Sequence, residues 1–217
     1  MSVVQNPFIG RARQKAGGMV FSTWKGINVL KTKPLTVANP KTDKQLMRRS
    51  ALSQIVAIAR QITAALQLGF KEQAVFKSAF NAFTGYNLRN GFNYTLPPAA
   101  TPVPSAFLVA QGTISLTALT GFVADASLNN IVINWPTSAS QPGQSSADVA
   151  VIALFNQTEN KWLATNTSSP RNTGTATIAA GPLTINDGDT VMAYFFFYNV
   201  ANRKSSDSSW SSTVVIP

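Results

Sequence analysis

The spacing of apolar residues changes along the chain, and this change restricts the fold more than any other feature. Between residues 42 and 88 apolar side chains recur at helical spacing, as at Ile55, Ala59 and Ile62. From residue 129 on they gather in short runs such as "NNIVINWP" and "ADVAVIALFN", bounded by Ser, Asn, Gly and Pro. Helical segments followed by strand segments indicate an α+β protein.

A β-hairpin is expected ahead of the helices. The runs at residues 19–24 and 27–32 are rich in β-branched and aromatic residues and are separated by Lys25-Gly26. Gly17 and Gly18 are expected to permit a tight entry into this hairpin. Trp24 is either a residue that stacks on a base or saccharide or an anchor of the core.

Two helices are expected after the hairpin. The sequence Thr42-Asp43-Lys44-Gln45 has the form of a capping box, in which the threonine side chain accepts from a backbone N–H one turn in. The apolar stripe that follows predicts a helix as far as Gly69, and a second helix is predicted over about residues 71–88. We expect the two helices to pack against each other and against the hairpin.

The strand-like runs of the second half predict an immunoglobulin-like or fibronectin type III β-sandwich. Ile131, Ile133 and Trp135 alternate as in a half-buried strand, so Trp135 is a candidate core residue between the sheets. An eight-stranded jelly roll is the alternative.

A proline-rich segment, "LPPAATPVPSA", carries four prolines in residues 97–104. This composition favours an extended, stiff connector. The predicted domains are therefore residues 1–96, with a basic arm, hairpin and helical hairpin; residues 97–106, a linker; and residues 107–217, the sandwich.

The basic residues are concentrated in one half of the chain. Residues 1–96 carry 14 Lys or Arg against two acids, whereas residues 97–217 have a net charge of −2. The basic stretch around the hairpin and the helix start is either a solvated surface or a site that binds a polyanion or an acidic protein. The candidate binding residues are Lys25, Lys31, Lys33, Lys41, Lys44, Arg48 and Arg49.

The N-terminal arm supplies a second candidate contact. Its apolar residues Phe8 and Ile9 are expected to connect subunits if the basic residues do not. The arm has no apolar run typical of a signal peptide, and no run is long enough to span a bilayer. We therefore expect synthesis in the cytoplasm without membrane insertion, with a virion or an extracellular assembly as an eventual location.

Catalytic chemistry is not expected from these residues. The chain has no histidine and no cysteine, so the commonest general base and metal ligands are absent. Asp187 and Asp189 form the only close acidic pair; they are expected to shape a turn, with weak calcium binding as the alternative. We expect no enzyme activity, no cofactor, no metal site and no small-molecule substrate.

The segment from "GGMVFSTWKGINVL" to "FNAFTGYNLRN" resembles a family of proteins of similar length and unknown function from Bacteroidota and their phages and prophages. The residues that carry the resemblance are Gly18, Trp24, Lys25, Gly26, Lys33, Pro34, Asn39, Pro40, Thr42, Gln45 and Arg49. The resemblance implies no activity, but the association with phages favours a component of a virion or another assembly.

Two classes of function follow. The first is a non-enzymatic structural protein, a homo-oligomer or part of a larger assembly, that assembles through its basic N-terminal half and displays the sandwich. The second is a protein whose N-terminal half coats DNA or RNA. A carbohydrate-binding sandwich, suggested by Trp162 and Trp210, is a third hypothesis.

Overall fold

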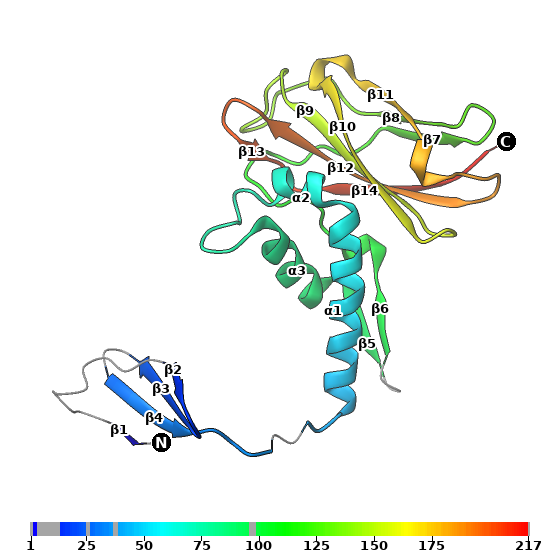
Figure 1. Cartoon of the computed structure of the whole chain (residues 1–217). Helices are drawn as coiled ribbons and strands as arrows, with labels where there is room; N and C mark the ends of the chain where they lie inside the picture. The colour runs from blue at the N-terminus through cyan, green and yellow to red at the C-terminus, as the bar shows by residue number, and fades with distance from the viewer. Residues whose placement is uncertain (1, 4–13, 25–26, 37–38, 96–98, 217) are drawn as a thin grey trace. The chain divides into compact units, whose positions relative to one another are not determined.

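The computed structural model describes residues 2–3, 14–24, 27–36, 39–95 and 99–216. It divides into two compact units, Met1–Lys41 and Thr42–Pro217, which are described separately (Figure 1).

The N-terminal unit is a four-stranded antiparallel sheet with the strand order β1-β4-β3-β2. Its strands are β1 (Ser2–Val3), β2 (Gln14–Ala16), β3 (Met19–Trp24) and β4 (Ile27–Thr32). The predicted hairpin is confirmed, because β3 and β4 have the predicted bounds. Gly17, at φ 57°, occupies the turn between β2 and β3, where a side chain would be strained.

Three helices follow: α1 (Asp43–Gln61), α2 (Thr63–Gly69) and α3 (Ala79–Asn90). The predicted cap is confirmed, because the Thr42 side chain accepts from the backbone N–H of Gln45 at 3.4 Å.

No single helix among the described residues is long and apolar enough to cross a membrane; α1 and α2 satisfy that test only together, across a bend of 91°.

The predicted helix bounds are wrong in two places. The first helix breaks at Ile62, where the Thr63 hydroxyl bonds to the carbonyls of Ala59 and Arg60 and competes with the helical pattern. The second helix begins only at Ala79, because the Ser78 side chain caps it by accepting from Asn81 N at 3.1 Å.

The proline-rich segment is not a free connector. Strand β5 (Phe92–Thr95) pairs with β6 (Ala99–Pro102), and a 3₁₀ turn, η1 (Pro104–Ala106), follows. Pro102 lies at the end of β6, a strand of a two-stranded sheet, where a missing N–H is tolerated. The β5–β6 hairpin packs along α1 (Figure 1).

The rest of the chain forms a β-sandwich. One sheet has the order β11-β8-β7, and the other has β10-β9-β12, with β13 and β14 both paired to β12. The strands are β7 (Gly121–Asp125), β8 (Asn130–Asn134), β9 (Val149–Asn156), β10 (Lys161–Pro170), β11 (Thr175–Ala179), β12 (Thr190–Asn199), β13 (Lys204–Ser205) and β14 (Ser209–Val214). The sheet β11-β8-β7 faces the sheet β10-β9-β12-β14. This is an immunoglobulin-like, fibronectin type III-like arrangement, and it confirms the predicted fold class.

The core between the two sheets contains the predicted tryptophan. Trp135 is 3% exposed and stacks on Phe195 with ring centroids 5.3 Å apart. Its indole N–H donates to the carbonyl of Arg171 at 2.9 Å, so the buried polar end is satisfied.

A second core joins the helices to the sandwich. Alternate residues of β12 point to opposite faces, so Phe195 and Phe197 enter the inter-sheet core while Tyr194 and Phe196 pack with the helices. The predicted domain boundary at residues 97–106 is therefore wrong. Residues 42–217 share apolar cores as one unit, and the division falls between Lys41 and Thr42.

Candidate functional site

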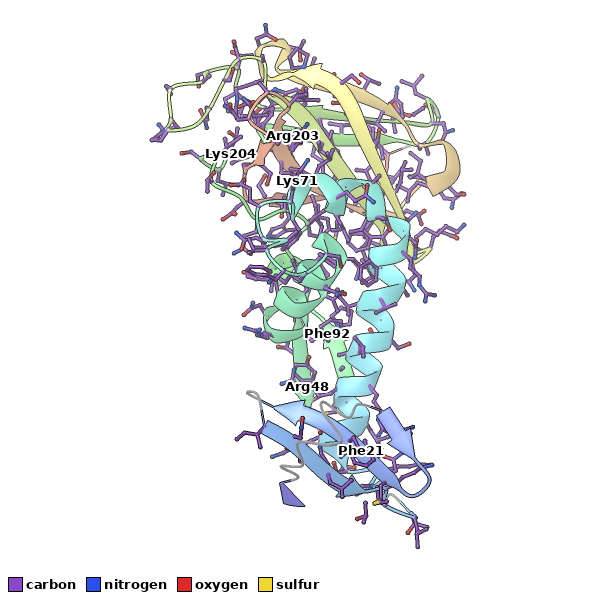
Figure 2. All side chains as sticks on the ribbon, turned by 60° about the vertical axis from the view of Figure 1, so that its left-hand side comes forward. Phe21, Arg48, Lys71, Phe92, Arg203 and Lys204 are labelled. Atoms are coloured by element: carbon purple, nitrogen blue, oxygen red, sulfur yellow. The ribbon has the colours of Figure 1, made fainter. Side chains whose placement is uncertain are left out.

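The N-terminal sheet has one face without charged side chains among its described residues. The register places Phe21 opposite Leu30 and Met19 opposite Thr32, so these residues share a face. The face also carries the uncharged polar residue Asn28 and is here called the apolar face after Met19, Phe21 and Leu30. Phe21 and Leu30 are partly exposed, and Met19 is 44% exposed. Figure 2 shows Phe21 on this sheet.

The opposite face mixes apolar and basic residues. Val20 pairs with Lys31, Ser22 pairs with Val29, and Lys15 lies beside Val20. Among the described residues of this unit, Val29 is the one apolar side chain that is buried. A sheet normally buries one of its faces, so this unit presents more apolar surface than it covers.

Residues 1–41 contain seven Lys or Arg and no acid. Of the predicted binding residues in this unit, Lys31, Lys33 and Lys41 are exposed, whereas Lys25 lies outside the described residues. Trp24 ends β3, but its side chain lies outside the described part of the structure. Phe8 and Ile9 of the predicted arm also lie outside it.

The other three predicted cations, Lys44, Arg48 and Arg49, belong to α1 in the second unit. Arg48 has a structural contact that the sequence did not indicate: its Nη1 donates to the carbonyl of Leu88 at 3.1 Å. Its guanidinium also lies 4.1 Å from the ring centroid of Tyr94, a cation–π contact that joins α1 to β5. The seven predicted residues are thus divided between two units.

A further group of exposed cations was not predicted. Lys71 follows α2, and Arg203 and Lys204 lie at the turn into β13 (Figure 2). Glu72 ties these segments together, because its carboxylate accepts from the backbone N–H of Ser205 at 2.9 Å. Sequence alone gave no signal for this group, because the segments meet only through tertiary packing.

Of the acidic pair for which the sequence left alternatives open, Asp189 has structural partners. Asp189 accepts from the Asn156 amide at 2.8 Å and from Asn186 N at 3.0 Å, and the Asn156 bond is the main cause that lowers the pKa of this carboxyl. These contacts favour the turn interpretation of the Asp187–Asp189 pair. Within the described residues no group of three or more His, Cys, Asp or Glu could hold a metal ion.

The two tryptophans of the carbohydrate hypothesis differ in exposure. Trp210 on β14 is 42% exposed. Trp162 on β10 is half-buried and stacks on Phe155 and Tyr194, with ring centroids 4.6 and 5.3 Å apart.

The fold and these surfaces define an α+β protein. It has a small basic sheet and a fibronectin type III-like sandwich with helices packed on one of its sheets. The chain belongs to a family of unknown function, DUF6266, whose model matches residues 10–211. The predicted membership of a family of unknown function is confirmed.

No curated protein matches the chain. Among solved structures, the fibronectin type-III domain of human fibronectin type III domain containing protein 3 matches with 12% identity and a TM-score of 0.33, over 50% of this chain and 89% of that one. A β-1,2-glucanase from Parabacteroides distasonis matches with 16% identity and a TM-score of 0.27, over 48% of this chain and 14% of that one.

Proposed function

We propose that the protein is a non-enzymatic assembly protein that associates with further copies of itself through the apolar face of its N-terminal sheet. The observation that carries this proposal is the apolar face itself, where Met19, Phe21 and Leu30 stay partly exposed. In this assembly the sandwich is the displayed part.

The size of the N-terminal unit supports an intermolecular partner. A unit of about 40 residues rarely buries enough apolar surface to be stable without disulfides, metals or oligomerisation. This chain has no cysteine for a disulfide and neither histidine nor cysteine for the common structural metal sites. When the apolar faces of two copies pack together, they bury the apolar surface that a single copy leaves exposed.

The charge of this unit sets how assembly responds to salt. Residues 1–41 carry a net charge of +7, so copies repel one another at low ionic strength. The Debye length falls from about 30 Å at 0.01 M salt to about 10 Å at 0.1 M. Added salt should therefore strengthen self-association.

The resemblance to proteins of Bacteroidota and their phages supports a virion or a surface as the proposed location of this assembly. The sandwich suits display, because the loop of residues 136–147 is mostly exposed and rich in Ser and Gln.

The apolar face is tested by the double variant Phe21→Thr and Leu30→Thr, since threonine retains a high strand propensity. We expect the variant to lose assembly in sedimentation velocity while the sandwich stays folded. The matched control is Val123→Thr with Val214→Thr, two exposed strand residues of the second unit, which should assemble as wild type does. Unchanged assembly of the Phe21/Leu30 variant would reject this face.

A second candidate function is nucleic-acid binding, favoured by the seven cations without an acid in residues 1–41. Each neutralised phosphate of a duplex contributes about 0.9 to the slope of log affinity against log salt. Anisotropy with a labelled DNA duplex should then show weaker binding at higher salt, the opposite of the trend for self-assembly. Lys31→Gln with Lys33→Gln should reduce the slope, whereas Lys71→Gln with Lys204→Gln, in the other unit, should not.

A further inference from the structure

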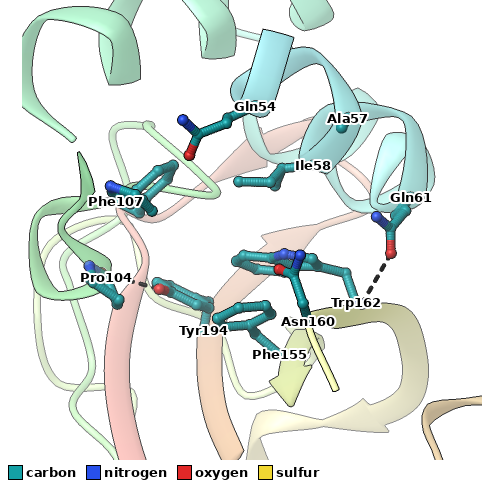
Figure 3. A pocket seen from close by; sticks show the side chains of 11 residues that line it. Gln54, Ala57, Ile58, Gln61, Pro104, Phe107, Phe155, Asn160, Trp162 and Tyr194 are labelled. Carbon is teal, nitrogen blue, oxygen red and sulfur yellow. Dashed lines mark hydrogen bonds between the residues drawn. The ribbon is translucent and has the colours of Figure 1, made fainter. Parts of the chain in front are cut away.

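A slot of about 170 Å³ lies in the second unit between α1 and the five-stranded sheet (Figure 3). Ile58 of α1 lies above it, and the indole of Trp162 lies below. Pro104 and Phe107 line one side of the slot, and Asn160 lies beside the indole. The volume corresponds to about six water molecules, which is room for one small ring and not for an oligomer.

The floor of the slot is held in place by several contacts. Trp162 stacks on both Phe155 and Tyr194, and Figure 3 shows these rings on the side of the indole away from Ile58. The Tyr194 hydroxyl donates to the carbonyl of Pro104 at 3.0 Å, and the backbone N–H of Trp162 donates to Gln61 Oε1 at 3.0 Å. A floor fixed in this way is pre-organised for a ligand.

Polar groups around the slot have unused hydrogen-bonding capacity. Trp162 Nε1 is buried without a partner. The Asn160 side chain makes no hydrogen bond to the described residues, and Gln61 uses its carbonyl oxygen but not its amide N–H groups. Trp162 Nε1 is a buried donor without an acceptor, whereas the Asn160 and Gln61 side chains are exposed, so their amides are accessible to a polar ligand.

The chemistry of the lining restricts the ligand. No charged side chain lines the slot among the described residues, which disfavours phosphates, carboxylates and ammonium groups. A purely apolar ligand would make no hydrogen bond to the exposed amides of Asn160 and Gln61. An aromatic surface combined with side-chain amides suits a ring that has both C–H faces and hydroxyl groups.

From these observations we infer that the slot binds a single neutral sugar ring, with one face of the ring on Trp162 and hydroxyl groups on the amides of Asn160 and Gln61. This site lies on the second unit and is independent of assembly through the N-terminal sheet.

Saturation-transfer difference NMR tests the site with full-length protein and four probes at millimolar concentration. The probes are methyl α-D-glucopyranoside, methyl α-D-mannopyranoside, methyl β-D-galactopyranoside and N-acetyl-D-glucosamine. We expect transfer to the ring protons of at least one of them. N-acetyl-phenylalaninamide serves as a probe for the competing occupant, an aromatic peptide side chain.

Two variants test whether the sugar binds in the slot. Ala57→Leu fills the slot from α1, and Asn160→Gly removes one amide while glycine accepts the left-handed conformation at φ 52°. Each should lower the affinity at least tenfold. Ser53→Leu adds the same side chain to an exposed position of α1 outside the slot and should bind as wild type does.

Three results would overturn the inference. The first is no transfer to any of the four sugars. The second is transfer that persists in Ala57→Leu, which would place binding elsewhere, for example at Trp210. The third is transfer to N-acetyl-phenylalaninamide alone, which would assign the slot to a peptide side chain.

Discussion

Arg171 is fully buried inside the sandwich together with its partner Asp148. Its Nη2 lies 3.4 Å from Asp148 Oδ2, its Nη1 donates to the Thr117 hydroxyl at 2.7 Å, and its guanidinium lies 3.7 Å from the ring centroid of Phe197. Burial is the main cause that lowers the pKa of this guanidinium, and Asp148 opposes it. The sequence gave no sign of this pair, because the partners lie on separate loops.

Replacing Asp148 by Asn should cost about 3 to 5 kcal/mol of unfolding free energy, because the Arg171 charge would stay buried without its counter-ion. Urea denaturation measures this loss. The control Glu159→Gln removes the acid of an exposed ion pair with Lys161 and should cost less than about 1 kcal/mol. Similar losses in the two variants would mean that the buried pair contributes no more than a surface pair.

The lowered pKa of Asp189 predicts that the stability of the fold depends on pH. Hydrogen bonds lower its pKa in the folded state, so its contribution is present above the unfolded value of about 3.9 and is lost as pH falls through the folded value. Between about pH 6 and pH 3, Asp189→Asn should therefore lose less unfolding free energy than wild type does.

Asp187→Asn is the matched control, because Asp187 is an exposed acid in the same turn. It should follow the pH profile of wild type. If the profiles of the two variants coincide, the bonds to Asp189 do not stabilise the folded state.

Residue-scale prediction succeeded where a local pattern determines the role of a side chain. Thr42 was identified by its spacing from Gln45, and Trp135 by strand alternation. Arg48 could not be identified in this way, because its partners Leu88 and Tyr94 come from segments far along the chain.

At the scale of elements, β12 shows why the helices and the sandwich were predicted as separate domains. Its sequence "TVMAYFFFYN" is apolar almost throughout, and in the structure nearly every side chain is buried. A continuous apolar run indicates a strand covered on both faces, whereas alternation indicates a strand with one solvated face. The run in β12 therefore predicts that another part of the chain packs on the outer face of the sandwich. It does not show that this part is the helical region.

The cap of α1 gives an element-scale prediction. Thr42→Ala should lower the unfolding free energy by about 1 kcal/mol, because the bond to the Gln45 N–H is lost. Since α1 shares a core with the sandwich, thermal melting should show the loss in the transition of the whole second unit. Ser53→Ala, at an exposed position inside α1, should not destabilise it. A shift confined to a separate helical transition would contradict the shared core.

At the scale of the whole molecule, the shared core decides which fragments fold. A fragment of residues 42–217 should unfold in one cooperative transition. A fragment of residues 107–217 should aggregate or lack fixed tertiary structure, because it exposes Tyr194 and Phe196. Circular dichroism and heteronuclear NMR compare the two, and a well-folded fragment 107–217 would restore the linker as a true boundary.

Whole-molecule organisation was only partly predictable from the sequence. The α+β class, the hairpin and the sandwich follow from local periodicity and turn residues. The unit boundary at Lys41 does not, because the hairpin and the helices were expected to form one domain of residues 1–96. The prolines at 97–104 resemble a linker, yet Pro102 belongs to the β5–β6 hairpin that packs on α1.

The central claim, assembly through the N-terminal unit, is tested most directly by molar mass. Light scattering coupled to size-exclusion chromatography should be applied to nuclease-treated full-length protein and to residues 42–217, at low and high salt. We predict that the full-length chain exceeds its monomer mass of 23.2 kDa, more so at high salt, while residues 42–217 stay monomeric. A full-length chain that is monomeric at every salt concentration, or a fragment that assembles equally well, would contradict the account.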